Sequence, residues 1–65
     1  MTIELTLPDM TCGHCVKTVT QLAQRLDPSA QVRTDLTRHT ATFDTATPES
    51  ELRQALADEG YPAAN

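Results

Sequence analysis

The spacing of apolar residues changes along this chain, and the changes predict the order of its secondary structure. Residues 2–7 alternate between apolar and polar side chains, which predicts a half-buried strand ended by Pro8. From about Gly13 to Leu26 the spacing becomes that of an amphipathic helix. The expected apolar stripe of this helix consists of Val16, Val19, Leu22, Ala23 and Leu26.

A second strand, a turn and a third strand are expected next. Residues 30–36 alternate again, residues 37–39 form a short polar turn, and residues 40–44 alternate once more. Two adjacent strands with so short a connection indicate a hairpin. The side chains expected to face inward are those of Ala30, Val32, Leu36, Ala41 and Phe43.

The second helix is bounded by clear signals. Thr47 is expected as its N-cap and Pro48 as its first helical residue, with Gly60 as the C-cap. Residues 61–65 remain, and they provide for a last strand of three or four residues at most.

The resulting order, β-α-β-β-α-β, consists of two strand-helix-strand halves. This order is that of an α+β ferredoxin-like sandwich. We therefore expect one domain over residues 1–65 with a four-stranded antiparallel sheet, a short last strand, and both helices on one face.

Length and composition exclude several classes of function. A chain of 65 residues buries too little surface to hold a deep catalytic cleft. Nine acidic residues against five basic ones argue against nucleic-acid binding. The chain has no apolar run of membrane-spanning length, and it begins without the basic segment of a signal peptide. A cytoplasmic protein is expected, in which a close cysteine pair is more often metal-binding or catalytic than structural.

The only two cysteines, Cys12 and Cys15, lie where the first strand gives way to the first helix. Unpaired N–H groups and the positive end of the helix dipole stabilise thiolates at such a position. Lys17 adds positive charge nearby, or is an ordinary solvated lysine. A tightly spaced thiolate pair with its charge stabilised in this way suits a soft metal ion.

The number of further ligands separates the candidate metals. Structural zinc takes four protein ligands and catalytic zinc three, whereas His14 is expected to point outward and His39 to be an exposed turn residue. Copper(I) is soft, selects thiolates and tolerates low coordination. Met10 either donates its thioether or packs in the gap below the loop, and packing is the favoured interpretation. A dithiol redox protein remains an alternative, because Cys-x-x-Cys at a helix start is also a redox motif.

The segment "MTCGHC" (10–15), followed by the apolar stripe, "VRTDL", "ATFD" and "ELRQALADEGYPA", resembles a heavy-metal-associated domain over nearly the whole chain. In size, the chain resembles the bacterial cytoplasmic copper chaperones of the CopZ type. The resemblance implies that Cys12 and Cys15 ligate Cu(I), that Met10 is a buried loop anchor, and that Tyr61 packs beside the metal loop. Relatives that favour zinc or cadmium tend to carry aspartate where Thr11 stands, which supports copper.

The resemblance also implies partners and a mechanism. The expected partners are the soluble metal-binding domain of a copper P-type ATPase and a copper-responsive regulator, and a copper-bridged homodimer is a further expectation. Transfer is expected by thiolate ligand exchange. A carrier or buffer for mercury or silver is the second alternative, because the same two sulfurs suit those metals.

Overall fold

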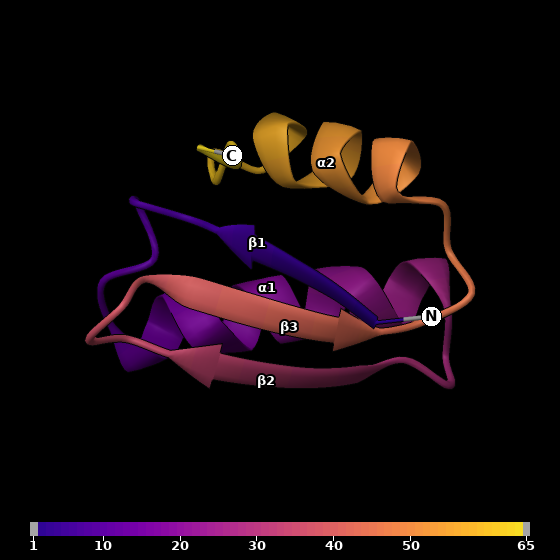
Figure 1. Cartoon of the computed structure of the whole chain (residues 1–65), viewed down its shortest axis with the longest axis horizontal. Coiled ribbons are helices and arrows are strands. Elements are labelled where there is room, and N and C mark those ends of the chain that lie inside the picture. Colours follow the sequence, from indigo (N-terminus) through magenta and orange to yellow (C-terminus); the bar gives the residue numbers. More distant parts are fainter. Residues whose placement is uncertain (1, 65) are drawn as a thin grey trace.

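Three strands and two helices make up the part of the chain that the computed structural model describes, residues 2–64 (Figure 1). The elements, in chain order, are β1 (Thr2–Thr6), α1 (Gly13–Leu26), β2 (Gln31–Asp35), β3 (Thr40–Asp44) and α2 (Glu49–Asp58). The strands form one sheet in the order β1-β3-β2, and both neighbouring pairs are antiparallel. The predicted helix over residues 13–26 and the third strand over 40–44 are confirmed.

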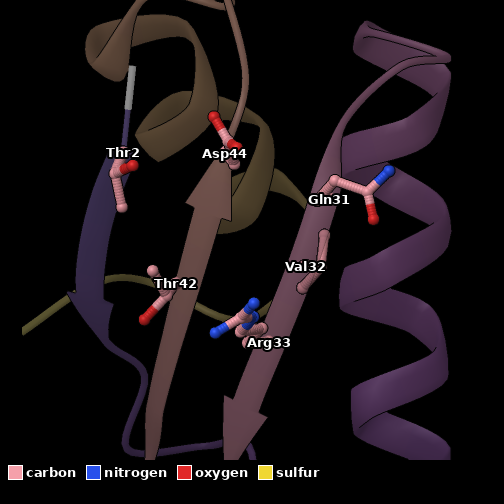
Figure 2. Close-up of a pocket in the computed structure, with 6 residues that line it drawn as sticks. All are labelled: Thr2, Gln31, Val32, Arg33, Thr42 and Asp44. Atoms are coloured by element: carbon pink, nitrogen blue, oxygen red, sulfur yellow. The ribbon is translucent and has the colours of Figure 1, made fainter.

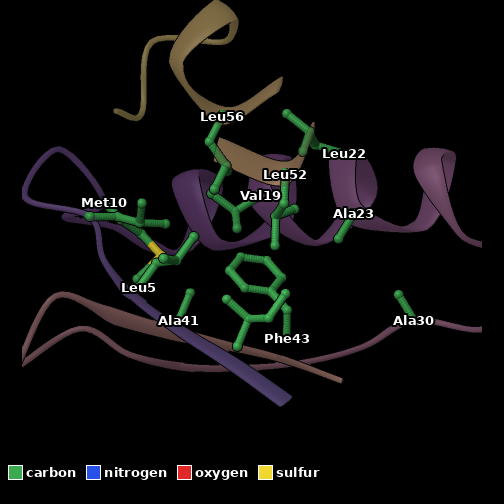
Figure 3. Packing of buried hydrophobic residues seen from close by; sticks show 12 residues of the cluster. Leu5, Met10, Val19, Leu22, Ala23, Ala30, Ala41, Phe43, Leu52 and Leu56 are labelled. Atoms are coloured by element: carbon green, nitrogen blue, oxygen red, sulfur yellow. The ribbon is translucent and has the colours of Figure 1, made fainter. Parts of the chain in front are cut away.

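The core lies between the sheet and the two helices. Ile3 pairs with Phe43 and Leu5 with Ala41, so the apolar side chains of β1 and β3 share one face. Figure 3 shows side chains of both helices directed at Phe43 from the same side of the sheet. The helical residues of the core are Val19, Leu22, Ala23, Leu52 and Leu56. The predicted two-layer arrangement is confirmed.

The opposite face of the sheet carries polar side chains. Figure 2 shows a pocket there, with the side chains of Thr2, Thr42 and Arg33 spread over it. This face has no helix over it in Figure 1, as the in-out alternation predicted.

The prediction of a four-stranded sheet was wrong for residues 2–64, which contain three strands. Residues 61–64 reach the outer edge of β1 through one backbone bond, from the N–H of Ala64 to the carbonyl of Thr6 at 2.8 Å. Pro62 has no N–H, and the N–H of Tyr61 is already bonded to the carbonyl of Leu56. Too few donors therefore remain for a ladder, and the expected end of the strand at Asn65 lies outside the described residues.

Two side chains expected in the core are exposed. Leu26 is 43% exposed, because it is the last residue of α1 and the chain turns away at Asp27. Leu36 is 38% exposed, because β2 ends at Asp35 rather than continuing to residue 36. The carboxylate of Asp35 accepts hydrogen bonds from the N–H groups of Thr37 and Arg38, at 3.0 and 3.2 Å, and so starts the turn early.

The ends of α2 also differ from the expectation by one residue each. Pro48, not Thr47, is the N-cap, and its carbonyl accepts the first helical hydrogen bond, from Leu52. Thr47 is instead buried, with its hydroxyl 3.1 Å from that of Thr45. At the other end the C-cap is Glu59, and Gly60 follows it with a φ of 91°.

The carboxylate of Asp27, the C-cap residue of α1, makes the stability of the protein depend on pH. Asp27 accepts hydrogen bonds from the hydroxyl of Thr45 at 2.7 Å and from the N–H of Ser29 at 3.0 Å. These bonds, led by that of Thr45, lower the pKa of Asp27 below its ordinary value of 3.8. The stabilisation is therefore complete above pH 3.8 and is lost as the pH falls through the lowered pKa.

We expect the free energy of unfolding, measured by urea titration, to fall less between pH 7 and pH 3 in Thr45→Val than in the natural protein. Valine keeps the shape of threonine and removes the hydroxyl donor. An equal fall in both proteins would show that Asp27 does not carry this part of the pH dependence.

Candidate metal centre

The two cysteines occupy the start of α1, on the same side of its first turn. Cys12 is the N-cap residue, with extended backbone angles (φ −149°, ψ 170°), and Cys15 lies three positions later. N-cap and N3 side chains approach one another at any helix start. The two Sγ atoms are 3.2 Å apart, with Cys12 exposed and Cys15 half-buried.

The first turn of α1 contains no carboxylate, whereas that of α2 contains Glu49 and Glu51. The positive end of the α1 dipole therefore faces the thiols without compensation from an acidic side chain of that turn. Hydrogen bonds from the Tyr61 side chain, from the backbone of Thr11 and from Cys12 lower the pKa of Cys15 from 9.0 to about 7. The lowered pKa increases the share of Cys15 that is thiolate at neutral pH, the form that binds soft metals.

Tyr61 reaches the thiols because of the way α2 ends. The N–H of Tyr61 bonds to the carbonyl of Leu56 at 2.8 Å, and that of Gly60 bonds to the carbonyl of Ala57 at 3.1 Å. These two bonds, with the positive φ of Gly60, form a Schellman motif. The motif turns the chain so that Tyr61 packs against the core with its hydroxyl at Cys15.

We expect Tyr61→Phe to raise the pKa of Cys15 above about 7. The phenol is the largest cause of the lowered value, and phenylalanine keeps the ring without the donor. The absorbance of the thiolates in the metal-free, reduced protein, followed against pH, measures this shift. An unchanged titration curve would exclude the hydrogen bond, and Thr20→Val serves as the control, because it removes a hydroxyl of the same helix.

Met10 is fully buried, immediately before the two-cysteine loop. Figure 3 shows its side chain inside the core beside Leu5. Its backbone N–H donates to the carbonyl of Leu7 at 3.0 Å. The favoured sequence interpretation, packing below the loop, agrees with this position.

The remaining predicted residues lie at the surface around the thiols. Thr11, His14 and Lys17 are exposed, and His14 contributes its carbonyl to a hydrogen bond from the Thr18 hydroxyl at 3.1 Å. Within residues 2–64 no group of three or more His, Cys, Asp or Glu side chains is placed to hold a metal ion. The described part of the chain therefore offers a soft metal two sulfur ligands and an open side.

His39 is a residue that the sequence did not mark as part of the site. It was expected to be an exposed turn residue, but it is half-buried, and its ring Nδ1 lies 3.2 Å from the carbonyl oxygen of Met10. Its own carbonyl accepts a hydrogen bond from Leu7 at 2.7 Å. In the sequence, the short polar turn was only a weak indication that His39 has a special conformation, the positive φ of 55°. Nothing in the sequence indicated the contact between His39 and Met10, which are 29 positions apart.

No helix among residues 2–64 has the length and apolar character needed to cross a bilayer.

Comparison with known proteins places the chain among small metal-binding domains. The chain is 38% identical to the copper chaperone Atx1 from Synechocystis PCC6803, with a TM-score of 0.89 over 94% of this chain and 97% of that one. A gold binding protein is 33% identical, with a TM-score of 0.88 and 92% of each chain covered. Oxidized MerP from Ralstonia metallidurans CH34 is 31% identical, with a TM-score of 0.82 over 98% of this chain and 93% of that one. No curated protein sequence matches the chain.

The family described as "Heavy-metal-associated domain" matches residues 4–62. The matched range contains the last three residues of β1, all of α1, β2, β3 and α2, the two cysteines and Tyr61. By its sequence and by its fold, the chain belongs to the heavy-metal-associated domain family.

Proposed function

We propose that this protein is a cytoplasmic copper(I) carrier that holds the ion between the Sγ atoms of Cys12 and Cys15. The observation that carries the proposal is the exposed thiol pair, 3.2 Å apart, without a third metal-ligating side chain grouped with it in residues 2–64. Copper(I) is satisfied by two thiolates, whereas zinc takes at least three protein ligands. The cytoplasm keeps thiols reduced, which is the state that such a site needs.

Transfer follows from the low coordination number. A thiolate of the partner forms a third bond to copper, and one Cu–S bond of this protein then breaks, so the ion moves with no change in oxidation state. We assign the partner role to the soluble metal-binding domain of a copper P-type ATPase, or to a copper-responsive regulator. The same exchange between two copies would give a copper-bridged homodimer. Support comes from the likeness to a copper chaperone and from the exposure of Cys12.

The neighbouring residues favour a soft cation in this proposal. Thr11 carries no carboxylate, so no hard oxygen ligand directly precedes Cys12. Lys17 is exposed, two residues beyond Cys15, and brings no further ligand for a hard cation. Met10 is buried in the core directly before the loop, and the Tyr61 side chain lowers the pKa of Cys15. His14 stays at the surface and takes no ligand role.

A mercury or gold carrier is the second candidate, supported by the likeness to MerP and to a gold binding protein. Both metals prefer the same pair of sulfurs. A dithiol redox function is the third, supported by the short Sγ–Sγ distance and by the lowered pKa of Cys15. The three candidates differ in what the reduced protein does with copper.

The deciding experiment is an anaerobic titration of the reduced, metal-free protein with Cu(I) in the presence of a chromophoric Cu(I) chelator. We expect the natural protein to take one copper ion per chain from the chelator and the double variant Cys12→Ser, Cys15→Ser to take none. Equal, weak binding by both proteins would refute the copper proposal. A parallel insulin-reduction assay decides the redox candidate, and competition between Hg(II) and Cu(I) decides between the metals.

A further inference from the structure

His39, in the turn between β2 and β3, bonds to the segment that precedes the two cysteines. Its carbonyl accepts the N–H of Leu7 at 2.7 Å, and its ring Nδ1 is 3.2 Å from the carbonyl of Met10. His39 therefore contacts both ends of the segment from Leu7 to Met10, Leu7 through its backbone carbonyl and Met10 through its ring, and this segment leads into Cys12. Both contacts connect residues about 30 positions apart in the sequence.

Met10 is held by three restraints, of which His39 supplies one. Its side chain is fully buried, its N–H donates to the carbonyl of Leu7 at 3.0 Å, and its own carbonyl meets the ring of His39. Side-chain burial alone leaves a peptide group free to rotate, but hydrogen bonds on both sides of the residue do not. The direction in which the chain leaves Met10 toward Cys12 is thus set partly by His39.

The two thiols differ in how they are held. Cys15 lies within α1 and is partly buried against the core. Cys12 precedes the helix, and its Sγ is exposed. Only the short connection through Thr11 joins Cys12 to the fixed residue Met10. The position of Cys12 therefore depends more on the loop than that of Cys15 does.

We propose that His39 is a positioning residue of the metal centre, which holds Cys12 in place by donating a hydrogen bond from Nδ1–H to the carbonyl of Met10. Its role in copper retention rests on the function proposed above, whereas the restraint itself does not. A carbonyl oxygen only accepts hydrogen bonds, so the proton must reside on Nδ1. The neutral ring is consequently in the Nδ1–H tautomer.

Two substitutions separate the hydrogen bond from the backbone conformation. In His39→Asn the amide nitrogen is bonded to Cγ, as Nδ1 is in histidine, and asparagine tolerates the positive φ of 55°. His39→Gly accepts the same φ and lacks the donor. His14→Asn is the matched control, because it alters the exposed histidine that lies next to Cys15 in the sequence.

The first measurement is made on the metal-free protein. Nitrogen-15 NMR at pH 8 should show His39 protonated on Nδ1. Hydrogen exchange of the Met10 amide should accelerate about five-fold in His39→Gly, the value of one intramolecular hydrogen bond, and should return to the natural rate in His39→Asn. A ring protonated on Nε2 alone, or an exchange rate unaffected by glycine, would overturn the restraint.

The second measurement is the rate at which bound Cu(I) passes to a competing chelator. We expect His39→Gly to release copper about five-fold faster, with His39→Asn and His14→Asn close to the natural rate. Faster loop exchange with unchanged copper release would overturn the positioning role. If the natural protein binds no Cu(I), the proposed function fails, and the same comparison with Hg(II) still decides the role of His39.

Discussion

Replacing either Cys12 or Cys15 with serine is expected to lower the Cu(I) affinity by about 10²–10⁴-fold. With one thiolate already bound, the second binds as an intramolecular ligand at high effective concentration, because the two Sγ atoms lie 3.2 Å apart. Serine removes that second bond, since a neutral hydroxyl is a poor ligand for a soft ion. No described His, Asp or Glu side chain is grouped with the two cysteines to substitute for the lost thiolate.

Competition with a chromophoric chelator measures the affinity of each single variant. Thr11→Ser is the matched control, because it alters an exposed residue of the same loop and leaves both sulfurs in place. Urea unfolding of the metal-free variants should remain near the natural value, since Cys12 is exposed and Cys15 only half-buried. A single variant that keeps the natural affinity would show that the site needs only one of the two thiols.

Met10→Ala is expected to lower the free energy of unfolding by about 2–5 kcal/mol. The side chain is fully buried among core residues, so alanine leaves a cavity below the metal loop. Natural domains have a stability of only about 0.05–0.15 kcal/mol per residue, so this loss approaches the whole stability of so small a protein. Met10→Leu preserves the volume and should cost less than about 1.5 kcal/mol.

The leucine variant also decides what Met10 does for the metal. Urea unfolding gives the stability of both variants, and chelator competition gives the Cu(I) affinity of Met10→Leu. We expect the affinity to stay within a few-fold of the natural value, because the packing is kept and the thioether is not needed. A well-folded Met10→Leu protein that fails to hold copper would instead identify the sulfur of Met10 as a ligand.

Elements with a strong hydrophobic period were predicted from the sequence nearly to the residue. The helix Gly13–Leu26 and the strand Thr40–Asp44 have the expected bounds. Their inward side chains could be named because alternation and the helical stripe report burial directly. Errors occurred at element ends, where the pattern continues but the chain turns away. Leu26 and Leu36 are apolar and in phase, yet neither is followed by a segment that covers it.

The last strand failed for a different reason. Its residues are permissive for a strand, but a ladder needs donors, and the structure commits the N–H of Tyr61 to the cap of α2 while Pro62 has none. The sequence showed the proline. It did not show that the tyrosine amide would be used elsewhere.

The residues of the candidate site that could be predicted are those marked by their immediate neighbours in the sequence. The spacing of Cys12 and Cys15 marks the thiol pair within four residues, Met10 was noted because it lies just before that pair, and the family resemblance supplied Tyr61. His39 could not be found, because its contact with Met10 depends on the hairpin turn folding back onto the loop. Residues that act at a distance in sequence become visible only with the topology.

The Schellman motif after α2 connects the metal centre to the survival of the folded chain. Because Tyr61 follows this cap, an opening of the last turn of α2 also withdraws the hydroxyl from Cys15. Linkage works in both directions, so an ion bound only by the folded thiol pair stabilises the native state, by about 2.7 kcal/mol at a free concentration one hundred times its dissociation constant. Proteases act on the unfolded population. A metal-bound chain would therefore be degraded more slowly than a metal-free one, and the amount of protein in the cell would follow the supply of the ion.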